Sequence, residues 1–238
     1  MPMTPFSLLP ANETTRLQTL QNYDILHSLP EALFTEVVEL AATLFNVPIS
    51  LIALVAADEV QYKAVHGLPG LRSQPRVEAV CALAVKEEQA VVFTDLAHSH
   101  ALTLEAEVAA HSKGLRFYAG APLRAPDGHC IGTFCIIDRQ PRPFSAAEQL
   151  VLEQHAQLVA GLIAIRQQCL THPTHGEAHW EVVRTELAWE VQALIALVRY
   201  LATYSGTHIP VPADVLALVD RRLQELRGKL ADYYSESL

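Results

Sequence analysis

The residues most able to do chemistry in this chain are four cysteines, namely Cys81, Cys130, Cys135 and Cys169. None forms the Cys-x-x-Cys pair of redox motifs, and zinc needs ligands that are more tightly grouped. Cys130 and Cys135 fall five residues apart on one expected strand, so their side chains should point to opposite faces. Only one of them is then expected to share a face with Cys81. Catalysis by a thiolate and a resolving thiol is therefore not favoured.

A second group combines charged and hydroxyl side chains. Arg116 and Tyr118 lie two residues apart on an expected strand and so share a face. Together with Asp95, they can present a guanidinium, a hydroxyl and a carboxylate to an anionic or polar ligand. The alternative, which we favour, is a buried Asp95–Arg116 ion pair that ties an irregular segment to the sheet. Thr133, in the middle of the next strand, and Cys81 complete the candidate ligand-binding residues.

Three histidines, His172, His175 and His179, lie close together in the sequence. Two histidines one helical turn apart can share a metal ion, but no carboxylate or cysteine completes a set of ligands here. A phosphoacceptor role for His179 is also disfavoured, because Trp180 rather than an acidic residue follows it. Since P-loop, GxGxxG, HExxH and Ser-His-Asp patterns are missing as well, we expect no catalytic residue, no metal and no cofactor, and hence a non-enzymatic protein.

The first half of the chain predicts two helices and a hairpin. One helix should begin at Asn12 or Thr14, and a second should begin at Pro30, where a missing N–H is harmless. Residues 49–57, ISLIALVAA, are apolar on both faces, so helices should cover both sides of this strand. Residues 60–66 form the returning strand after an Asp-Glu turn.

Residues 68–115 are irregular, and binding sites commonly occupy such insertions. A short helix is expected from residue 78 to 85 and a short strand from 89 to 94. Two strong strands follow, at 116–124 and 130–138, and the Asp-Gly turn between them predicts a hairpin. Ser145 with Glu148 three residues later is typical of a capping box that begins a helix reaching residue 170.

The last part of the chain contains helical patterns only. One helix is expected from residue 177 to 204 and another from 213 to 233, with breaks at the glycine and prolines between them. The second has an uninterrupted heptad seam, and the first has a similar stripe with one stutter. Two such helices should pack as an antiparallel hairpin whose apolar stripe needs a cover. Either the first domain or a second copy can cover it, and we favour a homodimer.

Composition excludes several classes of protein. The 238 residues are 50% hydrophobic and 18% charged, which is enough to bury a large core. The net charge of −9 repels phosphate backbones, so nucleic-acid binding is not expected. No run approaches about 18 apolar residues, and the N-terminus lacks a basic start followed by an apolar stretch. We therefore expect no membrane span and no signal peptide, and a cytoplasmic location.

The stretch from Arg16 to Arg166 resembles a GAF domain of the bacterial signalling subgroup. The matching segments are RLQTLQNYDILHSLPEALFTEVVELAATLFNVPISLIALV, VCALAV and LRFYAGAPLRAPDGHCIGTFCIIDRQPRPFS. This resemblance implies an α+β fold with a central antiparallel sheet of five to six strands and helices on both faces. It also implies a small-molecule pocket between the sheet and the insertion. We expect a GAF-like sensory domain at 12–170 and a helical hairpin for dimerisation or output at 177–236.

The chain departs from several relatives of this family. It lacks the NKFDE-type signature of cyclic-nucleotide binders and the Cys-His pair of bilin binders. It reads Cys81-Ala82-Leu83 where many members of the subgroup read Cys-Ala-His. The resemblance implies an unknown small-molecule ligand, signal transduction and a signalling-protein partner. Two alternatives stay open, a thiol enzyme of the free methionine sulfoxide reductase type and a dimeric scaffold with a vestigial pocket.

Overall fold

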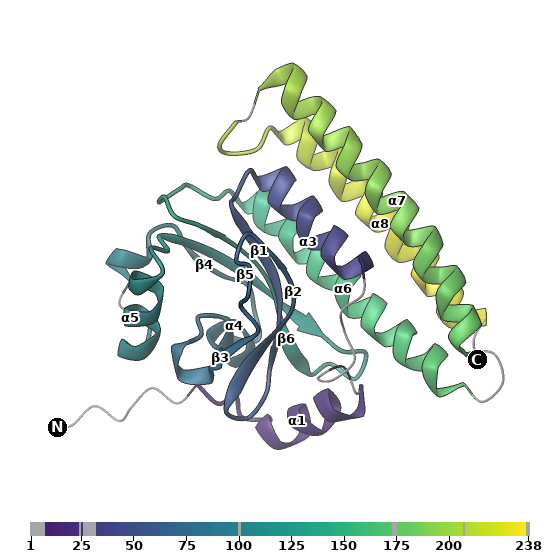
Figure 1. Cartoon of the computed structure of the whole chain (residues 1–238), viewed down its shortest axis with the longest axis horizontal. Coiled ribbons are helices and arrows are strands. Elements are labelled where there is room, and N and C mark those ends of the chain that lie inside the picture. Colours follow the sequence, from purple (N-terminus) through teal and green to yellow (C-terminus); the bar gives the residue numbers. More distant parts are fainter. Residues whose placement is uncertain are drawn as a thin grey trace.

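A six-stranded antiparallel sheet forms the centre of the protein (Figure 1). The computed structural model describes residues 8–23, 25, 32–99, 101–172, 176–206 and 208–236. The strands lie in the order β3-β2-β1-β6-β5-β4. Their bounds are β1 Ile49–Val55, β2 Glu59–His66, β3 Ser73–Pro75, β4 Val91–Phe93, β5 Phe117–Arg124 and β6 Cys130–Asp138. Every residue of β1 is buried, as its run of apolar residues, broken only by Ser50, predicted.

Helices cover both faces of this sheet, which confirms the expected α+β class. The α-helices are α1 Glu13–Asn22, α3 Ala32–Phe45, α4 Cys81–Glu87, α5 Leu104–Ser112, α6 Ala146–Thr171, α7 Gly176–Ser205 and α8 Ala213–Glu236. Short 3-10 helices lie at η1 Arg76–Glu78 and η2 Leu96–His98. Helices α3 and α6 pack on one face, and α4 packs on the other. The predicted start of the second helix at Pro30 lies outside the described residues.

The strand alternation divides the interior into two cores. On β6, Phe134 and Ile136 belong to the core under α3 and α6, whereas Cys135 and Ile137 belong to the core under α4. Helix α6 begins with the predicted capping box, in which the Ser145 hydroxyl accepts from the Glu148 amide and the Glu148 carboxylate accepts from the Ser145 amide.

The prediction that Cys130 and Cys135 point to opposite faces is wrong. Leu123 pairs with Gly132 and Arg124 pairs with Cys130, so Ile131 is left as an extra residue in the ladder. Such a bulge shifts the alternation by one residue. Cys130 and Cys135 therefore both belong to the core under α4, together with Cys81.

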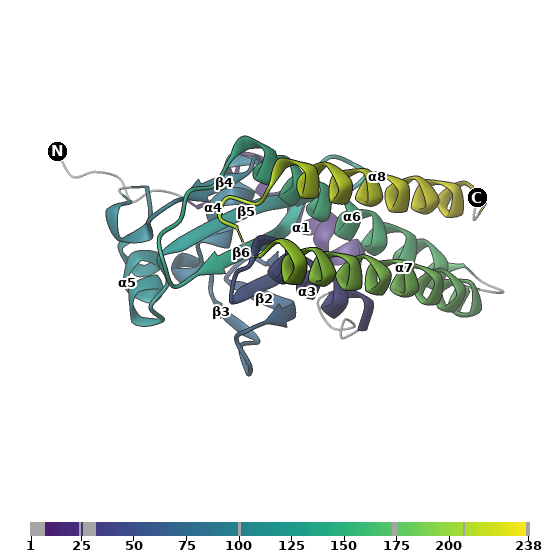
Figure 2. The same cartoon turned by 90° about the horizontal axis from the view of Figure 1, so that it is seen from above.

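Helices α7 and α8 run antiparallel and form an outer layer over α3 and α6 (Figure 2). The heptad residues of α8 are buried there, and they are Leu216, Val219, Leu223, Leu226 and Leu230. The apolar stripe is thus covered by the same chain and not by the second copy that we favoured. The division at residues 170 and 177 stays a prediction, since both parts contribute to one continuous core.

None of the helices within the described ranges is both long and apolar enough to cross a bilayer.

Candidate functional site

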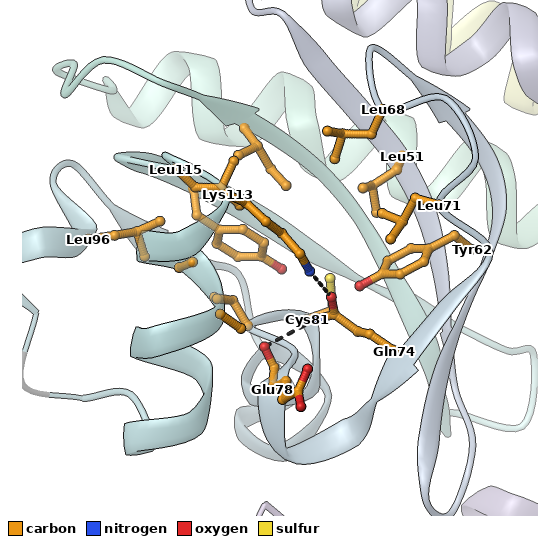
Figure 3. A pocket seen from close by; sticks show the side chains of 15 residues that line it. Leu51, Tyr62, Leu68, Leu71, Gln74, Glu78, Cys81, Leu96, Lys113 and Leu115 are labelled. Carbon is orange, nitrogen blue, oxygen red and sulfur yellow. Dashed lines mark hydrogen bonds between the residues drawn. The ribbon is translucent and has the colours of Figure 1, made fainter.

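A partly enclosed cavity lies on the α4 side of the sheet, between β1, β2 and the segment that leads through α4 and α5 to β5 (Figure 3). Most of its lining is aliphatic, and the polar members are Tyr62, Gln74, Glu78, Cys81, Lys113 and Tyr118. Its volume is about 40 Å³, which holds only a few water molecules. Known ligand pockets enclose roughly 300–1,000 Å³. The cavity in this conformation is therefore mostly filled by its own side chains.

Polar side chains close the mouth of this cavity. The Lys113 ammonium donates a hydrogen bond to the side-chain oxygen of Gln74, and the Gln74 amide donates to the backbone oxygen of Glu78 at 3.1 Å (Figure 3). The hydroxyl of Thr103, which caps α5, donates to the backbone oxygen of Val77 at 2.8 Å. These bonds join parts of the irregular segment to one another. They can open without breaking the sheet.

Buried hydroxyl and thiol groups lie beneath the cavity. Tyr118 is 1% exposed and Thr133 is fully buried, yet neither hydroxyl makes a hydrogen bond of ordinary geometry with the described residues, and the polar group that both approach is the Cys81 thiol. Unpaired buried polar groups carry a desolvation penalty and need a specific explanation. The Cys81 and Cys135 sulfur atoms lie beside them, 3.8 Å apart.

Burial and mutual contact separate the acidities of these groups. The hydrogen bond from the Cys135 thiol outweighs burial and lowers the pKa of Cys81. Burial raises the pKa of Cys135 well above its ordinary value and does the same for Tyr118. The Cys81 thiol is therefore the more readily ionised sulfur of the pair.

Asp95 and Arg116 form an ion pair outside this cavity. Arg116 Nε donates to Asp95 Oδ1 at 2.8 Å and its terminal nitrogen donates to Oδ2 at 2.7 Å. Asp95 also accepts from the Ala97 amide and caps η2, and the hydrogen bonds from Arg116 hold the pKa of its carboxyl far below the usual range. The pair ties the insertion to β5, as the favoured alternative predicted, although it is partly exposed and not buried.

The structure thus brings together three of the five candidate residues. Cys81 and Tyr118 line the cavity and Thr133 belongs to the adjoining cluster, whereas Asp95 and Arg116 lie elsewhere. Sequence reasoning missed Tyr62, Gln74, Glu78 and Lys113, which come from the irregular segment or its border. Only Tyr62 had a usable signal, as a large polar residue on a half-buried strand.

A larger groove, of about 550 Å³, lies between the end of β5 and helices α6 and α8. Its charged border mixes Glu88 and Glu153 with Arg124 and Arg227, and Arg124 already donates to the backbone oxygens of Gly128 and Glu88. The groove is open to solvent and contains no unpaired buried polar group. We therefore retain the partly enclosed cavity as the candidate site.

Histidines do not build a metal site in the part of the chain that the structure describes. No group of three His, Cys, Asp or Glu side chains lies close enough together there to hold an ion. His175, one of the three histidines considered above, lies outside the described residues.

Comparison with known proteins assigns this chain to a family. A family model described as the GAF domain matches residues 29–163, which is more than half of the chain. The chain belongs to the GAF domain family. The cavity lies where the resemblance implied a GAF pocket, between the sheet and the insertion.

One curated relative is a cyclic di-GMP phosphodiesterase of Pseudomonas aeruginosa, 30% identical over 155 residues. The match covers 65% of this chain and 26% of that enzyme, so the GAF chain spans about a quarter of the relative's length. The expectation of a non-enzymatic protein is corrected by this finding, because a relative that matches 65% of this chain is named as an enzyme. The P-loop, GxGxxG, HExxH and Ser-His-Asp patterns that would have predicted catalysis do not occur in this sequence.

Solved GAF structures resemble the chain at low sequence identity. The GAF domain of an Acinetobacter phosphoenolpyruvate-protein phosphotransferase is 19% identical, with a TM-score of 0.47, and covers 63% of this chain and 93% of its own. The blue-light-absorbing PixJ GAF domain of Thermosynechococcus elongatus is 14% identical, with a TM-score of 0.46, and covers 63% and 88%.

Proposed function

We propose that this GAF chain is a sensory module whose small-molecule ligand occupies the cavity between the sheet and the insertion. The observation that carries the proposal is the pair of buried, unpaired hydroxyls of Tyr118 and Thr133 next to this cavity. A ligand that accepts or donates hydrogen bonds would satisfy them, and the aliphatic lining would bury its apolar part. The ligand is thus a small, largely apolar molecule with a polar end.

Binding requires the insertion to move. The cavity of about 40 Å³ is too small for such a ligand, so the Lys113–Gln74 contact must open and the Tyr62 ring must shift. Lys113 and Gln74 lie on the segment between β2 and β5, whose closing bonds are few and near the surface, and Tyr62 lies on β2. The free energy of opening would lower the apparent affinity and make ligand binding responsive to contacts with the insertion.

A signal from the cavity would cross the sheet. Thr133 and Cys135 face the α4 side, while Phe134 between them stacks on His155 of α6, with ring centroids 5.5 Å apart. Helix α6 in turn contacts α7 and α8. A shift of β6 on ligand binding would therefore change the packing of the helical layer.

The relative suggests what the sensor controls. We infer that occupancy of the cavity controls cyclic di-GMP phosphodiesterase activity, carried by the same protein or by a signalling partner. Support comes from the relative's name and from a match that covers 65% of this chain. Cells that produce an Ala109→Phe variant, which fills the cavity mouth, should then contain a changed amount of cyclic di-GMP. Unchanged cyclic di-GMP would contradict this link.

Native mass spectrometry tests ligand binding directly. The chain is incubated with a small-molecule extract of the producing cells, and its mass is compared before and after denaturation. We expect the wild type to carry a mass that denaturation releases. The control variant Val108→Phe should carry it too, because Val108 is exposed on helix α5. Ala109→Phe should lose it because its ring occupies the site. No bound mass on the wild type, or equal binding by Ala109→Phe, would contradict the proposal.

We also propose that the chain forms a homodimer, through the outer face of α7 and not through the buried heptad stripe. Six apolar residues of α7 lie on a single face of the helix, because they follow one another at spacings of 7, 4, 3, 4 and 4 residues. They are Val182, Trp189, Ala193, Ala196, Tyr200 and Tyr204, and all are exposed. The four large ones offer roughly 500 Å² per copy. Two copies would bury about 1,000 Å², the lower limit for a stable interface.

Size-exclusion chromatography with light scattering tests this dimer. The wild type should elute at twice the chain mass of 26.2 kDa. Trp189→Glu, at a side chain that is 77% exposed, should shift the protein to the monomer mass. Leu104→Glu is the control, because Leu104 is equally exposed on the distant helix α5. A monomeric wild type, or a Trp189→Glu variant that stays dimeric, would contradict the interface.

A further inference from the structure

All four cysteines are free and buried, but two of them lie in direct contact. Cys81 Sγ lies 3.8 Å from Cys135 Sγ, so no other atom separates the sulfurs. A disulfide requires a sulfur–sulfur distance of about 2.0 Å. Rotation of the two side chains about their Cα–Cβ bonds would have to close the remaining gap of about 1.8 Å. Cys81 begins α4 and Cys135 lies in the middle of β6, so a bond between them would join helix to sheet.

The cavity gives one sulfur of this pair access to a small reactant. Cys81 lines the cavity and its sulfur points into it beside the Tyr62 side chain (Figure 3). Cys135 does not line the cavity and is fully buried behind Cys81. The cavity of about 40 Å³ accommodates a molecule the size of hydrogen peroxide, which is little larger than water. The two thiols therefore have different roles available to them.

We propose that Cys81 and Cys135 are an oxidative modification site that a hydroperoxide converts into an intramolecular disulfide. The Cys81 thiolate attacks one peroxide oxygen, so that an S–O bond forms while the O–O bond breaks. The leaving oxygen takes a proton and departs as water or an alcohol, and Cys81 becomes a sulfenic acid. The Cys135 thiolate then attacks the Cys81 sulfur, the S–S bond forms, and the S–O bond breaks with release of water. Two thiols lose two electrons and one peroxide gains them.

The electrostatics agree with this order of events. The hydrogen bond from Cys135 lowers the pKa of the Cys81 thiol, which makes Cys81 the better source of thiolate. Burial raises the pKa of Cys135, so this thiol stays protonated until the sulfenic acid forms beside it. The hydroxyls of Tyr118 and Thr133 lie next to the sulfurs and have no other partner among the described residues. They can donate to the oxygen that leaves.

Intact mass after thiol alkylation in denaturant tests the proposal on the full chain. Treatment with hydrogen peroxide should lower the number of alkylated thiols from four to two, and dithiothreitol should restore four. A peptide that joins Cys81 to Cys135 should appear in a non-reducing digest. Cys130→Ser and Cys169→Ser are matched controls, and each should fall from three thiols to one. Cys130 is the sharper control, since it belongs to the same core.

Two variants assign the roles of the two sulfurs. Cys135→Ser should retain a sulfenic acid on Cys81, detected as an adduct of a cyclic 1,3-diketone, while Cys81→Ser should form neither adduct nor disulfide. Circular dichroism checks that both variants fold. Four alkylated thiols in the peroxide-treated wild type, or a disulfide that joins any other pair, would overturn the proposal. Because the disulfide forms in the ligand-free chain, its failure leaves the ligand-binding proposal standing, and the reverse also holds.

Discussion

Replacing Thr133 with valine is expected to stabilise this protein, which is the opposite of the usual effect of a buried substitution. Thr133 is fully buried on β6, and its hydroxyl has no hydrogen-bond partner in the described structure. The folded state therefore bears the desolvation penalty of that hydroxyl without compensation. Valine keeps the β-branched shape that the strand accommodates and replaces the hydroxyl by a methyl group.

The size of the effect follows from the two terms that change. An unsatisfied buried hydroxyl costs about 1–3 kcal/mol, and a buried methyl contributes about 0.8 kcal/mol. After allowance for imperfect fit, we expect the free energy of unfolding to rise by about 1–2 kcal/mol. In a domain of this size, 1 kcal/mol shifts the melting temperature by about 2–4 °C. The Thr133→Val variant should therefore melt roughly 2–8 °C above the wild type.

Thr19 provides a matched control for the same substitution. Its side chain is also buried, but its hydroxyl donates to Asp127 Oδ2 at 2.5 Å. A hydrogen bond to a charged group contributes about 1.5–3 kcal/mol, so Thr19→Val should melt roughly 3–12 °C below the wild type. Urea unfolding and differential scanning calorimetry would measure both variants. The two substitutions should thus change the melting temperature in opposite directions.

A Thr133→Val variant that loses 1 kcal/mol or more would refute this reasoning. That outcome would mean that the hydroxyl has a partner in solution, such as a bound water molecule or a neighbouring thiol. The argument that the site holds an unpaired group for a ligand would then fail as well. If the variant is stabilised, the same protein should retain less of any releasable small molecule, because the group that binds its polar end is gone.

Three further predictions concern ionisable side chains in the protein interior. Glu148→Ala leaves the Arg142 guanidinium buried without its carboxylate partner. The free energy of unfolding, measured in urea, should therefore fall by roughly 3–5 kcal/mol. Glu153→Ala on the same helix is the control and should lower it by less than about 1 kcal/mol. Equal effects would contradict this. Burial lowers the pKa of His155 to about 4, so between about 4 and 6.5 the unfolded chain binds the proton more tightly. Stability should fall by about 3 kcal/mol as pH drops through that window, and a His155→Phe variant with the same slope would disprove the assignment. Burial alone would raise the pKa of Glu13, but the hydrogen bonds and positive charges of Arg16 and Arg76 together outweigh it and lower the pKa to about 2. The contribution of Glu13 to stability is therefore present above about 4.5 and is lost as pH falls toward 2. Glu13→Gln should remove that part of an acid-unfolding titration, and an unchanged titration would count against it.

Local patterns determined much of the fold from the sequence alone. The run of residues 49–55, apolar except for Ser50, predicted a strand covered on both faces, and β1 is buried throughout. Ser145 and Glu148 predicted the start of α6, where both capping hydrogen bonds are present. The heptad spacing predicted the buried face of α8. These features succeed because each depends on neighbours within one or two turns of the same element.

Such patterns predicted only part of the candidate site. Cys81, Tyr118 and Thr133 were found, but the bulge at Ile131 placed Cys130 and Cys135 on one face against the simple alternation. A bulge depends on the register with the partner strand, which no local pattern records. Lys113 and Gln74, which close the cavity, are 39 residues apart in a segment without period.

The sequence by itself determined which faces of the helices and strands are apolar, and the tertiary structure decided what covers each face. Either a second copy or α6 of the same chain could bury the apolar stripe on α8, because the hydrophobic effect depends on the area removed from water and not on the partner that covers it. The structure places it against α6. The contact between Cys81 and Cys135 likewise depends on how α4 docks on β6, across 54 residues of chain. Periodicity specifies that a side chain is buried, and only the packing of distant elements specifies its neighbours.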